Sequence, residues 1–105
     1  MKVNHGISCT MTAKPGRGDR LTELLLTGLE NGNPGSSEYC IVYLVSRSQS
    51  KPDVVHITEG WTTKQDHDRV FDTPAAQAIV ARFEDLLAGA PAYADHVPVN
   101  GKATF

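Results

Sequence analysis

Two consecutive stretches decide the fold of this chain: "EYCIVYLVS" (residues 38–46) and "DVVHITEGWT" (residues 53–62). Both are rich in β-branched and aromatic residues, which favour strands. The connection between them is short and polar, so we expect the two strands to pair antiparallel. Residues i and i+2 of a strand share a face, so Glu59 and Trp61 lie on the same face as Ile57. A carboxylate on that apolar face is expected either to have hydrogen-bond partners or to have a role in binding or catalysis.

The N-terminal part supplies one more strand and a helix. Residues 2–12 alternate between apolar and polar or small side chains, the pattern of a half-buried strand. The sequence "KPGRGD" (residues 14–19) ends it. Asp19 or Gly18 is placed to cap a helix that begins near Arg20, and "NGNPG", with Gly32, ends that helix. Its apolar stripe consists of Leu21, Leu24, Leu25 and Leu29.

The C-terminal part predicts a split helix and a last strand. Thr63 resembles the first residue of a capping box that opens a short helix through Phe71. Thr73 and Pro74 restart the chain as N-cap and first residue of a longer helix, ended by "GAP". Residues 93–99 read as a final strand, which Pro98 restricts to an edge or makes irregular. The apolar face of the longer helix consists of Ala76, Ile79, Val80, Phe83, Leu86 and Leu87.

The element order is therefore β-α-β-β-α-β, with the second helix broken at Asp72–Thr73. This order predicts an α+β, ferredoxin-like fold: one antiparallel sheet with the helices on one face, in a single domain of residues 1–105. The stretch at residues 38–46 is apolar on both faces, so we expect a homodimer that packs sheet on sheet. The alternative is a strand half-buried under the loops of its own chain.

Composition excludes several function classes. The chain has 105 residues, 10 Lys+Arg and 12 Asp+Glu spread along it, and a formal charge of −2, which argues against nucleic-acid binding. No apolar run reaches membrane-spanning length and the start is no signal peptide, so we expect a cytoplasmic protein without membrane contact. Cys9 and Cys40 are expected as free thiols. The four histidines include His5 and His56 on paired strands, but none shows metal-ligand spacing, and we expect no metal.

Three short motifs carry a resemblance to a known family. "TAKPG" closes the first strand, "EGW" closes the third, and "TP" opens the last helix. In this order and spacing the chain resembles the antibiotic biosynthesis monooxygenase family from about Val3 to Val99. The resemblance implies a dimeric α/β barrel, in which two ferredoxin-like protomers join through their sheets. It also implies an apolar pocket between each sheet and its helices.

Members of that family differ in activity. Some oxidise phenols or anthrones to quinones with O₂ and no cofactor, and some degrade haem. The iron-binding His of the haem branch falls on Val70 here, and its first-strand Asn falls on Ser8 or Cys9, which argues against haem degradation. The quinone-forming branch has an Asn where this chain has Ile57, which weakens the match to anthrone chemistry. The resemblance thus implies a cofactor-independent monooxygenase, or a close relative, acting on a small aromatic or polyketide-like compound.

Seven residues are candidates for the site: Glu59 and Trp61 match the family motif, and His67 and Arg82 follow from their places on or beside inward helical stripes. The catalytic candidates are His67 and Glu59, and the substrate-binding candidates are Trp61, Arg82, Ile57, Phe71 and Phe83. Structural roles stay open for several of them: a tied carboxylate for Glu59, core packing for Trp61, packing for His67, and a solvent-seeking guanidinium for Arg82. Two other functions also stay open. One is a non-catalytic dimer that binds an apolar ligand or a quinone, and the other is a structural or stress-response dimer whose pocket its own side chains fill.

Overall fold

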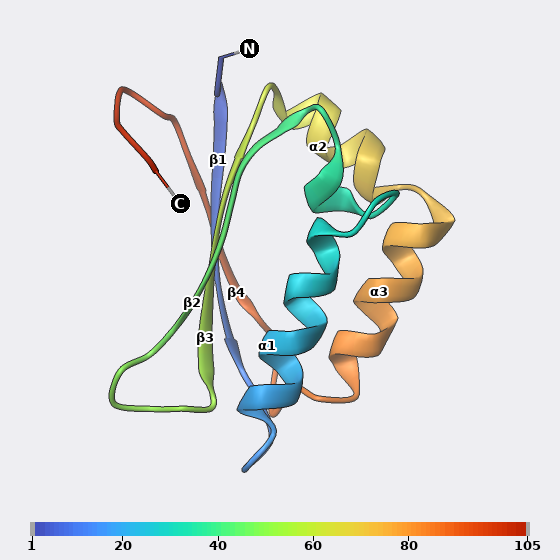
Figure 1. Cartoon of the computed structure of the whole chain (residues 1–105), viewed down its shortest axis with the longest axis vertical. Coiled ribbons are helices and arrows are strands. Elements are labelled where there is room, and N and C mark those ends of the chain that lie inside the picture. The colour runs from blue at the N-terminus through green and yellow to red at the C-terminus, as the bar shows by residue number, and fades with distance from the viewer. Residues whose placement is uncertain (1, 105) are drawn as a thin grey trace.

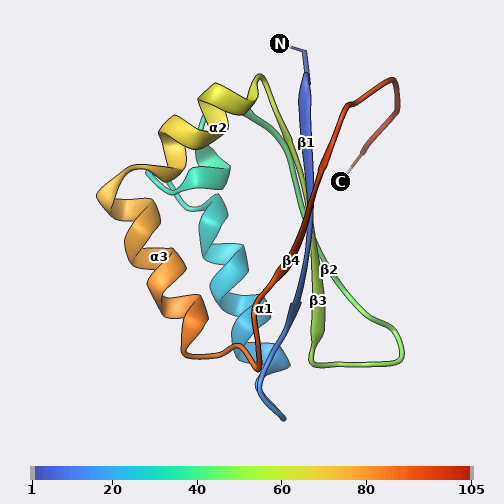
Figure 2. The ribbon, with the colours of Figure 1, turned by 180° about the vertical axis from the view of Figure 1, so that it is seen from behind.

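A computed structural model of the chain describes residues 2–104 and shows four antiparallel strands in the order β2-β3-β1-β4. The helices cover one face of this sheet (Figures 1 and 2). This confirms the ferredoxin-like α+β fold. The elements are β1 (His5–Thr12), α1 (Gly18–Leu26), the 3₁₀ helices η1 (Thr27–Leu29) and η2 (Pro34–Ser36), β2 (Cys40–Arg47), β3 (Val54–Trp61), α2 (Lys64–Phe71), α3 (Pro74–Glu84) and β4 (Ala92–His96).

The start of α1 differs from the expected local cap. The helix begins at Gly18, and neither Asp19 nor any other nearby side chain caps it. Instead, the carboxylate of Asp53, just before β3, accepts hydrogen bonds from the backbone amides of Gly18 (2.9 Å) and Gly16 (3.1 Å). The free amides at a helix start need acceptors. Here a residue distant in sequence supplies them, which ties α1 to the hairpin.

The caps of the other two helices are confirmed. Thr63 Oγ1 accepts from the Asp66 amide at 3.0 Å, and Thr73 Oγ1 accepts from the Ala76 amide at 3.3 Å, with Pro74 following as the first helical residue. Both later elements end sooner than expected. Helix α3 stops at Glu84 and β4 at His96. The strand stops there because Pro98, just beyond it, cannot donate to the hydrogen-bond ladder.

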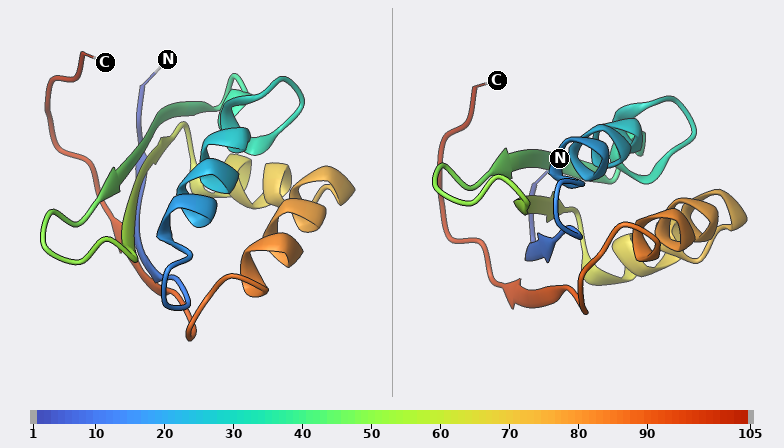
Figure 3. Two further views of the ribbon diagram at one scale, coloured as in Figure 1. Left: turned by 60° about the horizontal axis from the view of Figure 1, so that its bottom comes forward. Right: turned by 90° about the horizontal axis from the view of Figure 1, so that it is seen from below.

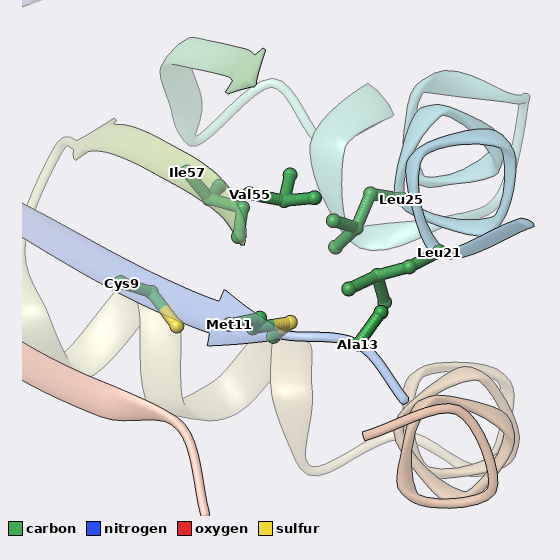
Figure 4. Close-up of a cluster of buried hydrophobic side chains, with 7 residues drawn as sticks. All are labelled: Cys9, Met11, Ala13, Leu21, Leu25, Val55 and Ile57. Carbon is green, nitrogen blue, oxygen red and sulfur yellow. The ribbon is translucent and has the colours of Figure 1, made fainter. Parts of the chain in front are cut away.

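The hydrophobic core lies between α1 and the middle of the sheet. Figure 4 shows the side chains of β1, β3 and α1 meeting there. Each cluster member is at most 5% exposed, and Leu21 and Val55 are fully buried. The cluster consists of Cys9, Met11, Ala13, Leu21, Leu25, Val55 and Ile57.

The other face of the sheet has no helix over it within residues 2–104 (Figure 3). Two polar pairs lie there: Ser8 Oγ is 2.7 Å from His96 Nε2, and Thr10 Oγ1 is 3.0 Å from His56 Nδ1. Half-buried apolar side chains adjoin them, namely Val42, Leu44 and Val54. No helix in residues 2–104 is long and apolar enough to cross a membrane.

Candidate functional site

A hollow of about 490 Å³ lies between the covered face of the sheet and the helices. It continues the core toward α2 and α3. Its walls are formed by residues of the sheet, of the helices and of the segments that connect them. Three of the predicted binding residues, Ile57, Phe71 and Phe83, line it, together with Ile79 and Val80 of α3. The walls are thus mostly apolar and aromatic, which is typical of a site for a small organic ligand.

Glu59 is the carboxyl group of this hollow. It lies on β3 between β1 and β2, opposite Ile7 and Tyr43. Its Oε1 accepts a hydrogen bond of 2.8 Å from the indole Nε1 of Trp61. Burial raises the pKa of Glu59, whereas the indole hydrogen bond and the nearby His67 act in the opposite direction. At a given pH the neutral form, which can donate a hydrogen bond, is therefore more populated than in a free carboxyl group.

Trp61 occupies a different place from the one predicted. The indole is 0% exposed and is not part of the surface of the hollow. It packs edge-on against the His67 ring, with centroids 5.1 Å apart, and against Phe71 at 5.8 Å. This burial agrees with the core-packing alternative for Trp61, and a contact between Trp61 and a ligand stays a prediction. Its place is behind the wall, where it supports Glu59 by hydrogen bonding and His67 by packing.

His67 lines the hollow from α2, as the sequence predicted. Its Nδ1 lies 2.9 Å from Oδ1 of Asp68, and this hydrogen bond is the main cause that lowers the pKa of Asp68. An ionised carboxylate only accepts, so Nδ1 donates the hydrogen bond. In the neutral ring Nε2 then carries the lone pair, which is the arrangement of a base. Asp68 could not be predicted from the sequence, because adjacent helical residues normally point in different directions.

His5 is a second histidine at the hollow. Its Nε2 lies 3.4 Å from Oδ1 of Asp95 without making a hydrogen bond, and its ring centroid is 6.3 Å from that of His67. Both His5 and Asp95 line the hollow. The alternation of β1 already put His5 on the face of Ile7, so this signal was present in the sequence. The register of β4, which brings Asp95 there, was not.

Arg82 lies outside the lining of the hollow, so the structure does not bring it together with the other predicted site residues. It is exposed on α3 and borders a separate groove with Arg20, Glu23 and Asp85. Ile79, Val80 and Phe83 of α3 face inward. Each residue of a helix is rotated by about 100° from the one before it. That rotation carries Arg82 to the outer side. Among the described lining residues, Lys64 is the only lysine or arginine.

The other titratable groups do not converge on a metal site. His56 and His5 lie on opposite faces of the sheet, and residues 2–104 contain no group of three His, Cys, Asp or Glu side chains placed to hold a metal. Burial raises the pKa of Cys9 to about 11 and that of Cys40 to about 12. Both thiols therefore stay protonated near neutral pH, and neither is a reactive nucleophile.

Comparisons with known proteins agree with this architecture. The profile of the Antibiotic biosynthesis monooxygenase family matches residues 6–82. A candidate antibiotic biosynthesis monooxygenase from Chloroflexus aurantiacus is 28% identical over 94% of this chain and 96% of its own, with a TM-score of 0.80.

Two further solved structures share the fold at lower identity. A candidate antibiotic biosynthesis monooxygenase from Caulobacter crescentus is 19% identical over 94% and 92% of the two chains, with a TM-score of 0.78. A protein from Pseudomonas aeruginosa is 17% identical over 95% and 98%, with a TM-score of 0.79. The comparison with curated protein sequences gives no significant match.

Proposed function

The chain belongs to the antibiotic biosynthesis monooxygenase family, and from that premise we propose that it oxidises a small phenolic aromatic compound to a quinone with O₂, without a metal or organic cofactor. The observation that carries the proposal is the oriented imidazole of His67 in an apolar hollow. Ground-state O₂ reacts slowly with closed-shell molecules, but an electron-rich phenolate can give it one electron. The task of the protein is therefore to remove a proton and exclude water.

His67 is the proposed base. Its Nε2 takes the hydroxyl proton, and the resulting imidazolium is stabilised by the Asp68 carboxylate on its other nitrogen. Glu59, whose pKa burial raises, donates a hydrogen bond to an oxygen of the ligand and so positions it. Phe71 and Phe83 stack beside the ring. Trp61 holds Glu59 and His67 in place from behind.

Oxygen consumption tests the proposal. We expect uptake above the uncatalysed rate for one or more members of a panel of dihydroxynaphthalenes and anthrones, with quinone formed in equal amount. His67→Gln should lower kcat/KM by about 10²- to 10⁴-fold, the usual contribution of a positioned base. Arg82→Gln is the matched control, because its guanidinium lies outside the hollow and its loss should leave the rate unchanged. Absence of uptake with every compound would reject oxygenation.

A second candidate function is non-catalytic binding of a neutral aromatic ligand or quinone. The observation that favours it is the charge of the lining. Among the described lining residues Lys64 is the one permanent cation, against the carboxyl groups of Glu59, Asp68, Glu84 and Asp95. Such a lining gives little stabilisation to an anionic intermediate. Micromolar binding of 1,5-dihydroxynaphthalene by calorimetry, together with no oxygen uptake, would support this function instead.

We also propose that the uncovered face of the sheet joins two copies of the chain. The half-buried Val42, Leu44 and Val54 lie on it, beside the Ser8–His96 and Thr10–His56 pairs. Apolar side chains on a face without helices favour burial against a partner. Sedimentation equilibrium should give twice the chain mass of 11.4 kDa. Leu44→Arg should shift the protein to the monomer, and a monomeric wild type would reject this interface.

A further inference from the structure

We infer that His5, held beside Asp95, is a second proton-transfer residue of the hollow and acts on the carbon that gains oxygen, while His67 acts on the hydroxyl group. This inference rests on the proposed function. It concerns a residue from a different part of the chain, since β1 carries His5 and α2 carries His67. The two imidazoles with their carboxylates form two proton-handling pairs in one space.

Strand pairing brings the second pair together. His5 is opposite Trp61 in β3, and Ile7 is opposite Asp95 in β4, so the Asp95 carboxylate comes beside the imidazole of His5. Nε2 of His5 is 3.4 Å from Asp95 Oδ1. With Nε2 facing this carboxylate, Nδ1 is the nitrogen left for a ligand. Asp95 thus lies beside His5 as Asp68 lies beside His67, but at the longer distance and without the hydrogen bond that joins His67 to Asp68.

The spacing of the two rings suits one small aromatic ligand. Their centroids are 6.3 Å apart. An atom hydrogen-bonded to a ring nitrogen lies about 4 Å from the ring centroid, because the bond itself spans about 2.9 Å. Both imidazoles can therefore reach atoms of the same molecule, one at its hydroxyl group and the other at a ring carbon. Glu59 comes to the same space from β3.

The hydrogen bonding of His5 also favours a functional role. Its side chain is 12% exposed, yet among the described residues no partner hydrogen-bonds the buried Nε2. A purely structural histidine at such a site is normally hydrogen-bonded, and an unpaired buried polar atom calls for an explanation. When His5 takes a proton in the proposed reaction, its imidazolium would pair with Asp95, which supplies one. The carboxyl groups of Asp68 from α2 and Glu59 from β3 and the ammonium group of Lys64 also line the hollow.

The proposed reaction needs two proton removals. Oxidation of a phenol with a free para carbon consumes O₂ and gives a quinone and water. His67 first takes the O–H proton, the phenolate transfers an electron to O₂, and the two radicals form a C–O bond at the para carbon. The proton on His67 then goes to the peroxide, which gives a hydroperoxide.

The second removal breaks the O–O bond. His5 takes the hydrogen of the oxygenated carbon as a proton, the C–H electron pair forms the C=O bond, and the distal oxygen leaves as hydroxide. That hydroxide takes the proton from His5 and becomes water. One oxygen atom of O₂ is then in the quinone and the other in water, and both histidines return to their neutral form. Two separate imidazoles fit these two steps better than one.

Rapid mixing separates the two proton transfers. The full chain is mixed with a dihydroxynaphthalene that the wild type oxidises. Without O₂, the phenolate absorbance reports the first proton transfer; with O₂, quenched samples report hydroperoxide and quinone. We expect His5→Gln to keep the phenolate signal, accumulate hydroperoxide and form quinone at least tenfold more slowly. His67→Gln should lose the phenolate signal. His56→Gln, on the opposite face of the sheet, is the control and should match the wild type at equal oligomeric mass.

Several results would overturn the inference. Quinone formation by His5→Gln within twofold of the wild type would remove His5 from the chemistry while leaving the proposed function intact. Loss of the phenolate signal in His5→Gln would assign it to the first step instead. If His5→Gln does not fold, Asp95→Asn on the exposed edge strand replaces it, with the same expected accumulation of hydroperoxide. A wild type that consumes no O₂ would reject the proposed function itself, and this inference with it.

Discussion

The two ends of the covered sheet face are built from the same strands with the same alternation, but they differ in what lies over them. At one end α1 buries Leu21, Leu24 and Leu25, and Leu21 and Leu25 join the core cluster with residues of β1 and β3. At the other end α2 has no buried residue and α3 has only Ala76. The hollow of about 490 Å³ is at that second end. We therefore expect the end under α1 to contribute most of the stability, and the end under α2 and α3 to bind the ligand.

The polar side chains follow the same division. The core cluster around Val55 contains no charged group. The hollow holds His5 and Glu59, which lie on the covered face of the sheet, and His67, which comes from α2. A polar group in a closed core is costly, whereas one beside an open space can hydrogen-bond to water or a ligand. The position of each polar residue thus marks where packing stops.

Truncation of an aliphatic side chain should give the largest difference in the free energy of unfolding between the two ends. Leu21→Ala should lower the free energy of unfolding by about 2–5 kcal/mol, because it leaves a cavity in close packing. Ile79→Ala, the matched change at the hollow, should cost about 2 kcal/mol or less, since its side chain already borders open space. Urea denaturation measures both. Equal losses would mean that the hollow is packed as tightly as the core.

Filling the hollow should abolish binding while the fold persists. Val80→Phe adds a phenyl group to the lining, and we expect the affinity for 1-naphthol, measured by calorimetry, to fall at least tenfold. The free energy of unfolding should stay within about 1 kcal/mol of the wild type, because open space accepts the added volume. Ala81→Phe, on the exposed side of α3, is the control. Unchanged affinity in Val80→Phe would place the ligand elsewhere.

The pH dependence of the free energy of unfolding should reveal the raised pKa of Glu59. Burial raises its pKa above the ordinary 4.5, so the folded state binds the proton more tightly than the unfolded state. Its contribution to stability is therefore complete below about pH 4.5 and is lost as the pH rises through the folded pKa. The pKa of Asp66 and Asp68 is lowered from 3.8, so their contributions change only at lower pH.

Glu59→Gln removes this titration but keeps an acceptor for the indole of Trp61. The variant should gain stability relative to the wild type between pH 5 and pH 8, with little difference near pH 4. Urea midpoints at matched pH values measure the gain. A difference that does not change with pH would show that the carboxyl group titrates as in the unfolded chain.

Much of the fold could be predicted from the sequence because its signals are local. Thr63, Thr73 and Pro74 act on the next few residues, and the hairpin composition fixes β2 and β3. The cap that Asp53 gives to α1 could not be predicted, since it joins residues far apart in sequence. The register of β4 against β1, which brings Asp95 beside His5, likewise joins residues far apart in sequence.

The site was predictable only where the periodicity of an element settled the direction of a side chain. Strand alternation placed Glu59 on the covered face, and the helical stripe placed His67 there. The burial of Trp61 behind Glu59 depends on how α2 packs against β3. Arg82 precedes the inward-facing Phe83 by one residue, and this step places its side chain on the exposed side of α3. Asp68 and Asp95 were missed because their partners become neighbours only through a side-chain rotamer or strand register.

The central claim is that the hollow binds an aromatic hydroxy compound beside Glu59 and His67. The most direct test is an NMR titration with 1-naphthol, because the chain has one tryptophan and its indole N–H, 2.8 Å from Glu59, gives a single side-chain signal. We predict that this signal and the amides of Glu59, His67 and Val80 shift in a saturable way while that of Leu21 stays unchanged. Shifts confined to the uncovered face of the sheet, or no shifts at millimolar ligand, would contradict the claim.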